Sequence, residues 1–211
     1  MTNPSIELYG AQTGNCLRAA IALEEAMVPY TVRHVDLRSG EHRRAAYLAL
    51  NPAGQVPTMV DRSDEASPFV LSQSNAIIFY AAARAPGRLL PEHEGQERAI
   101  AYERFFFFVT DVIAPSHAAF FLRRQNAVET PGLLDERMLA ALSAAERYVT
   151  RSSFMAGDSF SLADIAAFTI ASFVKERLPW DRLPNLDRWY RTVEARPAVV
   201  RGLRAFNNPP T

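Results

Sequence analysis

The sequence has little of what marks a disulfide-rich, nucleic-acid-binding or metal-binding protein. It contains one cysteine, Cys16, which excludes an internal disulfide. Lysine plus arginine equals aspartate plus glutamate at 23 residues each, so no net field draws the chain to nucleic acid or to an anionic membrane. The four histidines lack the spacing of a metal-ligand set. Any binding of an anion must therefore depend on local groups.

Long apolar runs are also missing from the sequence. No uninterrupted stretch of about 18 apolar residues occurs, which predicts that no segment spans a membrane. Residues 1–6 lack the basic start and the apolar stretch of a secretory signal. We therefore expect a cytoplasmic protein with no membrane, nucleic-acid or metal partner.

The first half of the chain alternates strand and helix signals. Alternating polarity, β-branched residues and turn residues predict strands at 5–9, 30–35, 57–60 and 69–71, and helices at 15–27, 42–50 and 73–84. Asn15 is the expected N-cap of the first helix, because its side chain can accept an orphan backbone N–H. The order β-α-β-α-β-β-α predicts an α/β sheet covered by helices.

The second half of the chain reads as helical. Residues 85–94 contain Pro86, Gly87 and Pro91, a breaker cluster typical of a linker. Beyond them, apolar residues recur at helical spacing in two sets: Tyr102, Phe105, Phe106, Val109 and Ile113, then Leu162, Ile165, Ala166, Thr169 and Phe173. The second set suits the central helix of a bundle. Ser161 and Asp164 match a capping box at its start, a structural role.

Two short segments carry the clearest functional signal. Residues 51–58 read Asn-Pro-Ala-Gly-Gln-Val-Pro-Thr, and Pro57 opens an apolar run although it cannot donate a ladder hydrogen bond. It therefore marks the first residue of a strand, and the backbone before it should stay unpaired. A free backbone at a sheet edge can bind another peptide by acting as a strand. In the second segment, 73–77, Ser74 begins a helix whose free N–H groups attract carboxylates. Together the segments predict a site for a small anionic peptide.

The order of several motifs resembles that of the cytosolic glutathione transferase superfamily, especially its Ser/Thr-type plant-like and bacterial branches. The motifs are Asn-Pro-Ala-Gly-Gln-Val-Pro at 51–57, Gln-Ser-Asn-Ala-Ile at 73–77, Ser-Leu-Ala-Asp at 161–164 and Ala-Arg-Pro at 195–197. The resemblance spans nearly the whole chain. It implies a thioredoxin-like glutathione-binding domain at 1–84, a linker at 85–94 and an all-helical C-terminal domain at 95–211.

The resemblance implies that Thr13 and Asn15 stabilise the thiolate of glutathione. An unassisted thiol has a pKa of about 8.5, and the nucleophile is the thiolate, so donors must be aimed at sulfur. Thr13 matches the family's hydroxyl donor and Asn15 the asparagine of the same motif, although Gly14 replaces the usual proline. A loop threonine that satisfies only local backbone is the structural alternative.

Two other residues near this loop compete for the same role. Cys16 lies one place beyond the position used by cysteine-type members, and it shares a helical apolar face with Ala20 and Leu23, which favours packing. Tyr9 lies at the strand end where tyrosine-type members carry their donor, but a tyrosine packed in the core is the favoured interpretation.

The resemblance also assigns the glutathione-binding residues. Val56 would pair its backbone with the cysteine of the tripeptide, and Pro57 would follow a cis peptide bond. Ser74 would bind the γ-glutamyl carboxylate, or serve as a simple N-cap, or both. Gln73 replaces the glutamate that would attract the tripeptide's ammonium in related branches.

Three further residues match those that hold the glycine end of glutathione in the plant-type branch: His42, Arg43 and Gln55. Arginine can bind a carboxylate through two parallel hydrogen bonds. The alternative for Arg43 is a solvated charge on a short helix. A metal role for His42 is not expected.

The resemblance implies a transferase that conjugates glutathione to a small, apolar electrophile, acts in detoxification and forms a homodimer. The second substrate would bind against the helix that carries Arg104, Phe107, Phe108 and Asp111. One alternative is a glutathione-dependent disulfide reductase or peroxidase of the same fold. Another is a non-catalytic interaction module, which Gln73 and Gly14 would favour.

Overall fold

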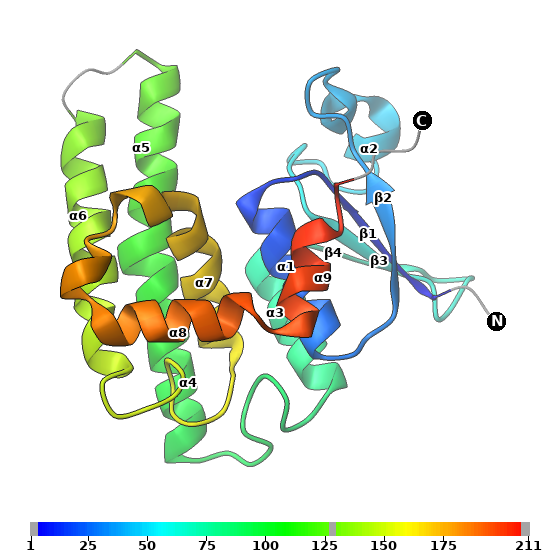
Figure 1. The fold of residues 1–211 in the computed structure, drawn as a ribbon. Helices are drawn as coiled ribbons and strands as arrows, with labels where there is room; N and C mark the ends of the chain where they lie inside the picture. The colour runs from blue at the N-terminus through cyan, green and yellow to red at the C-terminus, as the bar shows by residue number, and fades with distance from the viewer. Residues whose placement is uncertain (1–3, 127–129, 208–211) are drawn as a thin grey trace. The chain divides into compact units, whose positions relative to one another are not determined.

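The computed structural model describes residues 4–126 and 130–207. The chain packs as two units, one made of Met1–Leu89 with Arg196–Thr211 and the other of Leu90–Ala195. Figure 1 follows the chain through both, from the strands of the first unit into the helices of the second. Each unit has its own core.

A four-stranded sheet forms the centre of the first unit. Its strands are β1 (Ile6–Gly10), β2 (Tyr30–His34), β3 (Thr58–Asp61) and β4 (Phe69–Ser72), in the order β2-β1-β3-β4. Strand β1 pairs parallel with β2 and antiparallel with β3, and β3 pairs antiparallel with β4. This mixed sheet, followed by a helical unit, fits the thioredoxin-like fold with an all-helical second part.

The helices of the first unit follow the expected order with one addition. They are α1 (Gly14–Glu25), the 3₁₀ turn η1 (Glu41–Arg43), α2 (Ala45–Leu48), α3 (Ser74–Arg84) and α9 (Pro197–Arg204). The predicted helix at 42–50 is two short pieces, because Arg44 adopts an extended conformation between them. Strand β3 begins at Thr58, one residue after Pro57.

Helix α9 packs on α1, and Figure 1 shows the two side by side. A Cβ atom at Gly202 would lie 2.7 Å from the Cγ1 of Ile21, so only glycine allows this close approach. Arg196 also forms a two-bond ion pair with Glu25, at 2.6 and 2.7 Å. The packing thus groups Arg196 and α9 with the sheet, whereas the sequence analysis placed them in the helical domain.

Nine helical segments make up the second unit in the described part of the chain. They are α4 (Gln96–Phe107), the π-helical η2 (Phe108–Ile113), α5 (Ala114–Arg124), α6 (Thr130–Ala144), η3 (Ala145–Tyr148), α7 (Leu162–Val174), η4 (Lys175–Arg177), η5 (Trp180–Arg182) and α8 (Pro184–Glu194). Helix α7 is buried along its first ten residues, which confirms it as the central helix. Phe173 is the exception in its predicted stripe, at 73% exposure.

The capping box at the start of α7 is confirmed. The Ser161 hydroxyl accepts from the N–H of Ala163, while Asp164 accepts from the backbone N–H of Ser161 at 2.9 Å. Asp164 is fully buried and also accepts from Met155 N at 2.9 Å and from Trp189 Nε1 at 2.8 Å. This carboxylate therefore joins the loop before α7 to helix α8.

The predicted apolar face of α4 is partly wrong. Phe106, which belongs to the predicted set, is 52% exposed, while Phe108, which lies outside that set, is fully buried together with Phe105. Four consecutive phenylalanines fit two phases of a helix equally well, so periodicity could not choose between them.

The continuous helical stretch Gln96–Arg124 is long and apolar enough to cross a membrane, with a mean hydropathy of 1.6 in its best window. A single such helix is weak evidence, because the core helix of a soluble protein meets the same criteria. Its segments α4 and η2 both pack against α7, the buried central helix of the unit.

Candidate functional site

The sheet brings three separated segments to one edge. In the antiparallel pairing, Tyr9 lies opposite Thr58, and Thr58 lies opposite Ser72. The end of β1, the start of β3 and the end of β4 are therefore neighbours. The loop 11–13 that leads into α1, the Val56-Pro57 dipeptide and the start of α3 all extend from this edge.

Thr13 occupies the N-cap of α1, the position that the sequence gave to Asn15. Its Oγ1 accepts a hydrogen bond from Cys16 N at 3.4 Å, so the expected local role of this threonine is present. A hydroxyl that accepts one bond still has its own proton to donate. Thr13 therefore caps α1 and carries a hydroxyl proton that it can donate at the positive end of this helix.

Cys16 is a core residue, as the helical apolar face predicted. It is fully buried, and burial raises the pKa of its thiol, an effect that hydrogen bonds from Thr13 and Ala11 only partly oppose. A Cβ atom at Gly10 would lie 2.8 Å from this sulfur, which shows how closely the chain encloses it. A buried, protonated thiol is a poor nucleophile.

A buried arginine of α1 connects two of the predicted site residues. Arg18 is 3% exposed, and its Nη1 donates to Asn15 Oδ1 at 3.1 Å and to Ser74 Oγ at 3.3 Å. Burial lowers the pKa of Arg18 to about 10, which leaves it cationic at neutral pH. The sequence reasoning missed this residue. Its signal is an arginine inside an otherwise apolar helical run, residues 16–23.

The Val56-Pro57 peptide bond is cis, as the resemblance implied. The carbonyl just before it, that of Gln55, accepts from the hydroxyl of Tyr47 and from Asn51 Nδ2, both at 2.7 Å. Within residues 4–126 and 130–207, the backbone N–H and C=O of Val56 form no hydrogen bond with other backbone groups. The predicted open backbone at Val56 is therefore present, and the side chains of Tyr47 and Asn51 hold the carbonyl of the preceding residue, Gln55.

Those supporting side chains continue into the sheet. The Tyr47 hydroxyl lies 3.1 Å from Thr58 Oγ1, which in turn lies 3.1 Å from Ser72 Oγ. Tyr47 and Thr58 are buried, so this chain of hydroxyl groups links α2, β3 and β4. Sequence reasoning missed Tyr47 and Thr58, because a tyrosine and a threonine in short elements carry no motif of their own.

Gln73, rather than Ser74, is the N-cap of α3. Gln73 has φ +83°, rare for a residue other than glycine, and its Oε1 accepts from Asn75 N at 3.1 Å. Ser74 is the first helical residue and is 3% exposed, so the simple N-cap alternative for Ser74 is wrong. Asn75 Oδ1 is buried without a hydrogen-bond partner among the described residues.

The residues assigned to the glycine end lie near one another. His42 is part of η1, and its carbonyl oxygen would lie 3.1 Å from a Cβ at Gly54, next to Gln55. His42 Nε2 accepts from Arg43 Nε at 3.3 Å, and its Nδ1 is buried without a partner in the described structure. Arg43 and Gln55 are exposed.

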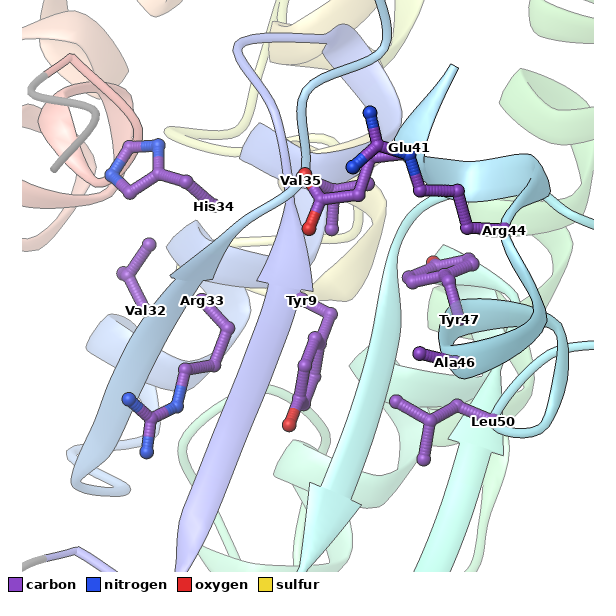
Figure 2. A pocket seen from close by; sticks show the side chains of 10 residues that line it. All are labelled: Tyr9, Val32, Arg33, His34, Val35, Glu41, Arg44, Ala46, Tyr47 and Leu50. Carbon is purple, nitrogen blue, oxygen red and sulfur yellow. The ribbon is translucent and has the colours of Figure 1, made fainter. Parts of the chain in front are cut away.

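A separate hollow of about 800 Å³ lies elsewhere in the first unit. Figure 2 shows its lining, which comes from β1, β2, η1 and α2 and from residues next to these elements: Tyr9, Val32, Arg33, His34, Val35, Glu41, Arg44, Ala46, Tyr47 and Leu50. Tyr9 is half-buried, and its hydroxyl donates to Glu7 Oε2 at 3.1 Å. None of the predicted site residues lines this hollow.

The residues expected to bind a second substrate lie in the second unit, where packing within the unit occupies several of them. Phe108 is fully buried, which removes it from any open surface. The guanidinium of Arg104 stacks 3.9 Å above the ring of Tyr148, and Phe107 packs edge-on against the same ring. Among the described residues, no group of three acidic, histidine or cysteine side chains could hold a metal ion.

Two family profiles match the chain. One is described as glutathione S-transferase, N-terminal domain, and matches residues 14–84. The other is described as glutathione S-transferase, C-terminal domain, and matches residues 109–197. Both matches lie in the order that the sequence motifs indicated.

Individual proteins are similar over nearly the whole chain. Glutathione S-transferase GstB of Escherichia coli K12 is 31% identical, covering 92% of this chain and 95% of its own. The disulfide-bond oxidoreductase YfcG of the same organism is 28% identical, covering 94% of both. Among solved structures, a glutathione transferase from Burkholderia graminis, with two glutathione molecules bound per subunit, has a TM-score of 0.83 at 25% identity and covers 95% of this chain and 88% of its own.

Proposed function

Because this chain belongs to the glutathione S-transferase family, we propose that it binds reduced glutathione and conjugates its thiol to a small electrophile. The proposal rests on three groups that lie at the same edge of the sheet. The Thr13 hydroxyl, the open backbone of Val56 and the buried hydroxyl of Ser74 all lie there. These groups match the thiol, the central peptide unit and the γ-glutamyl carboxylate of the tripeptide in kind and order.

Binding uses both strand-like pairing and a helix start. Val56 pairs its N–H and C=O with the cysteine residue of glutathione, while Ser74 donates to the γ-glutamyl carboxylate at the positive end of α3. His42, Arg43 and Gln55 hold the glycine carboxylate. Gln73 offers a neutral amide to the ammonium and already accepts from Asn75 N, which supports a weaker hold on that group.

Thr13 and Asn15 are the proposed catalytic residues. Both donate to the sulfur, and each donated bond favours the thiolate over the thiol and so lowers its pKa. The proton leaves to solvent, and the thiolate attacks an electrophilic carbon of the second substrate. A C–S bond forms, and the leaving group departs with its electron pair. We propose an apolar electrophile and a cytoplasmic homodimer on family grounds.

Glutathione-dependent disulfide reduction is the second candidate, and the observation that favours it is a relative with 28% identity that is named a disulfide-bond oxidoreductase. Cys16 is too buried to form a mixed disulfide itself, so the reaction would use the thiol of glutathione. The thiolate of bound glutathione would attack one sulfur of a disulfide and release the other as a thiolate. A second glutathione would then reduce the mixed disulfide and form oxidised glutathione. Reduction of a peroxide by the same thiolate is a variant of this reaction.

The two reactions are separated by steady-state turnover of the purified protein with reduced glutathione. One assay supplies an activated aryl halide and follows conjugate formation; the other supplies a small symmetrical disulfide and follows oxidised glutathione. Turnover of the aryl halide supports the transferase, and turnover of the disulfide alone supports the reductase. No turnover with either substrate, together with no binding of glutathione, would leave a non-catalytic interaction module.

A further inference from the structure

Arg18 is a charged side chain inside the sheet unit, and it lies between two elements of the proposed site. It projects from α1 and is 3% exposed. Its Nη1 donates both to Asn15 Oδ1, at 3.1 Å, and to Ser74 Oγ, at 3.3 Å. One nitrogen therefore connects a residue beside the thiol loop with a residue at the start of α3.

The chemistry of these contacts fixes the direction of two donors. A guanidinium group has only donors, so Asn15 must turn its amide oxygen towards Arg18. The NH₂ group of Asn15 then faces away from Arg18 and can donate to another acceptor. The Ser74 hydroxyl likewise accepts from Arg18 and retains its own proton for another acceptor.

We propose that Arg18 is a positioning residue that acts on bound glutathione through Asn15 and Ser74. It holds the Asn15 amide so that NH₂, rather than oxygen, faces the thiol. It also holds the Ser74 oxygen so that the hydroxyl donates to the γ-glutamyl carboxylate. This inference rests on the proposed function, because it assigns Arg18 a role at the same site.

A flipped amide would reverse the effect of Asn15. With its oxygen towards sulfur, the side chain would repel the thiolate and favour the thiol. Burial increases the effect of the Asn15 orientation on the thiol pKa, because polar interactions are stronger away from water. Arg18 remains cationic despite burial, with its pKa lowered only to about 10, so it also adds positive charge close to the developing thiolate.

The two effects of Arg18 can be separated by substitution. Arg18→Lys keeps the charge but loses the planar guanidinium whose Nη1 contacts both partners, whereas Arg18→Met removes charge and donors alike. Arg201→Met is the matched control, because Arg201 also contacts α1, through an ion pair with Glu24 at 2.6 Å near the end of the helix away from Thr13. Thermal unfolding checks that each variant is folded.

The readout is the pKa of the bound thiol, followed by the ultraviolet absorbance of thiolate as pH is varied, with KM for glutathione measured alongside. We expect Arg18→Met to raise the thiol pKa by about one unit and KM about tenfold, because donors to both sulfur and carboxylate are lost. Arg18→Lys should recover part of both effects. Arg201→Met should change neither.

Non-additivity tests whether Arg18 acts through Asn15. In an Asn15→Ala background, Arg18→Met should add little further to the thiol pKa, while its effect on KM through Ser74 should persist. Full additivity, or an unchanged thiol pKa in a folded Arg18→Met variant, would overturn this inference and leave the proposed function standing. Failure of the wild-type protein to bind glutathione would overturn both. If Arg18→Met does not fold, Arg18→Lys alone must shift the thiol pKa, and an unshifted value contradicts the proposal.

Discussion

Asp164→Ala removes one carboxylate that holds the helical unit together at three points. The fully buried side chain accepts from the backbone N–H groups of Met155 and Ser161, both at 2.9 Å, and from Trp189 Nε1 at 2.8 Å. The hydroxyl of Ser161 also donates to it, at 3.0 Å, but can rotate to another acceptor. Alanine would leave three N–H groups buried without an acceptor.

The cost follows from those three groups. Each buried donor left unsatisfied costs about 1–3 kcal/mol, and local relaxation or water entry recovers part of the sum, so we expect Asp164→Ala to lower the unfolding free energy by about 3–5 kcal/mol. Asp164→Asn keeps the shape and one acceptor oxygen but turns an NH₂ towards existing donors. We expect an intermediate loss of about 1–3 kcal/mol for this variant.

Urea denaturation followed by tryptophan fluorescence measures these losses directly. Both tryptophans of the chain, Trp180 and Trp189, belong to the helical unit and report on its unfolding. Asp187→Ala is the control, because Asp187 forms an exposed pair with Arg191 at 3.0 Å, and such pairs contribute only about 0–1 kcal/mol. If Asp164→Ala unfolds within 1 kcal/mol of the wild type, the reasoning from buried donors is refuted.

Four further predictions concern the sheet unit. Thr13→Ala should reduce glutathione-dependent turnover by about 10²-fold with KM little changed, whereas Thr13→Ser should turn over close to the wild-type rate. If Thr13→Ala turns over as fast as the wild type, Thr13 has no part in the mechanism. Cys16→Ala should leave turnover within about twofold, since the thiol is buried; a large loss would refute its packing role. Gly202→Ala should destabilise the fold by about 2–3 kcal/mol in thermal unfolding, because its Cβ would lie 2.8 Å from the backbone nitrogen of Ile21. Burial alone would raise the pKa of Asp61, but hydrogen bonds from Ser63 and Tyr80 and the charge of Arg84 lower it to about 2. The ionised carboxylate therefore stabilises the fold fully above about pH 4, and this stabilisation is lost as the pH falls towards 2. Asp61→Asn should flatten that part of the curve of unfolding free energy against pH.

Much of the fold could be predicted from the sequence, because its signals are local. Alternation and breakers located the four strands, and the apolar run from Leu162 located the central helix. Local signals failed where two arrangements satisfy the same pattern. Residues 105–108 are all phenylalanine and fit two helical phases. Helix α9 packs on α1 through a close approach at Gly202, which no sequence pattern predicts.

The candidate site divides in the same way. The Val56-Pro57 dipeptide could be predicted because proline excludes a ladder bond, and the sheet then places it beside the ends of β1 and β4. Tyr47 and Arg18 could not be predicted, because their roles depend on partners that lie 11 and 56 residues away in the sequence. Supporting contacts of this kind arise only after the chain has folded.

Calorimetric titration of the purified protein with reduced glutathione, repeated with a Ser74→Ala variant, tests whether glutathione binds at this sheet edge. We predict saturable binding to the wild-type protein and binding that is at least about tenfold weaker to Ser74→Ala, because a donor to the carboxylate is lost. Oxidised glutathione, titrated in parallel, should bind as well only if disulfide reduction is the activity. Absence of binding to the wild-type protein, or equal affinity of the variant, would contradict the placement of glutathione at this sheet edge.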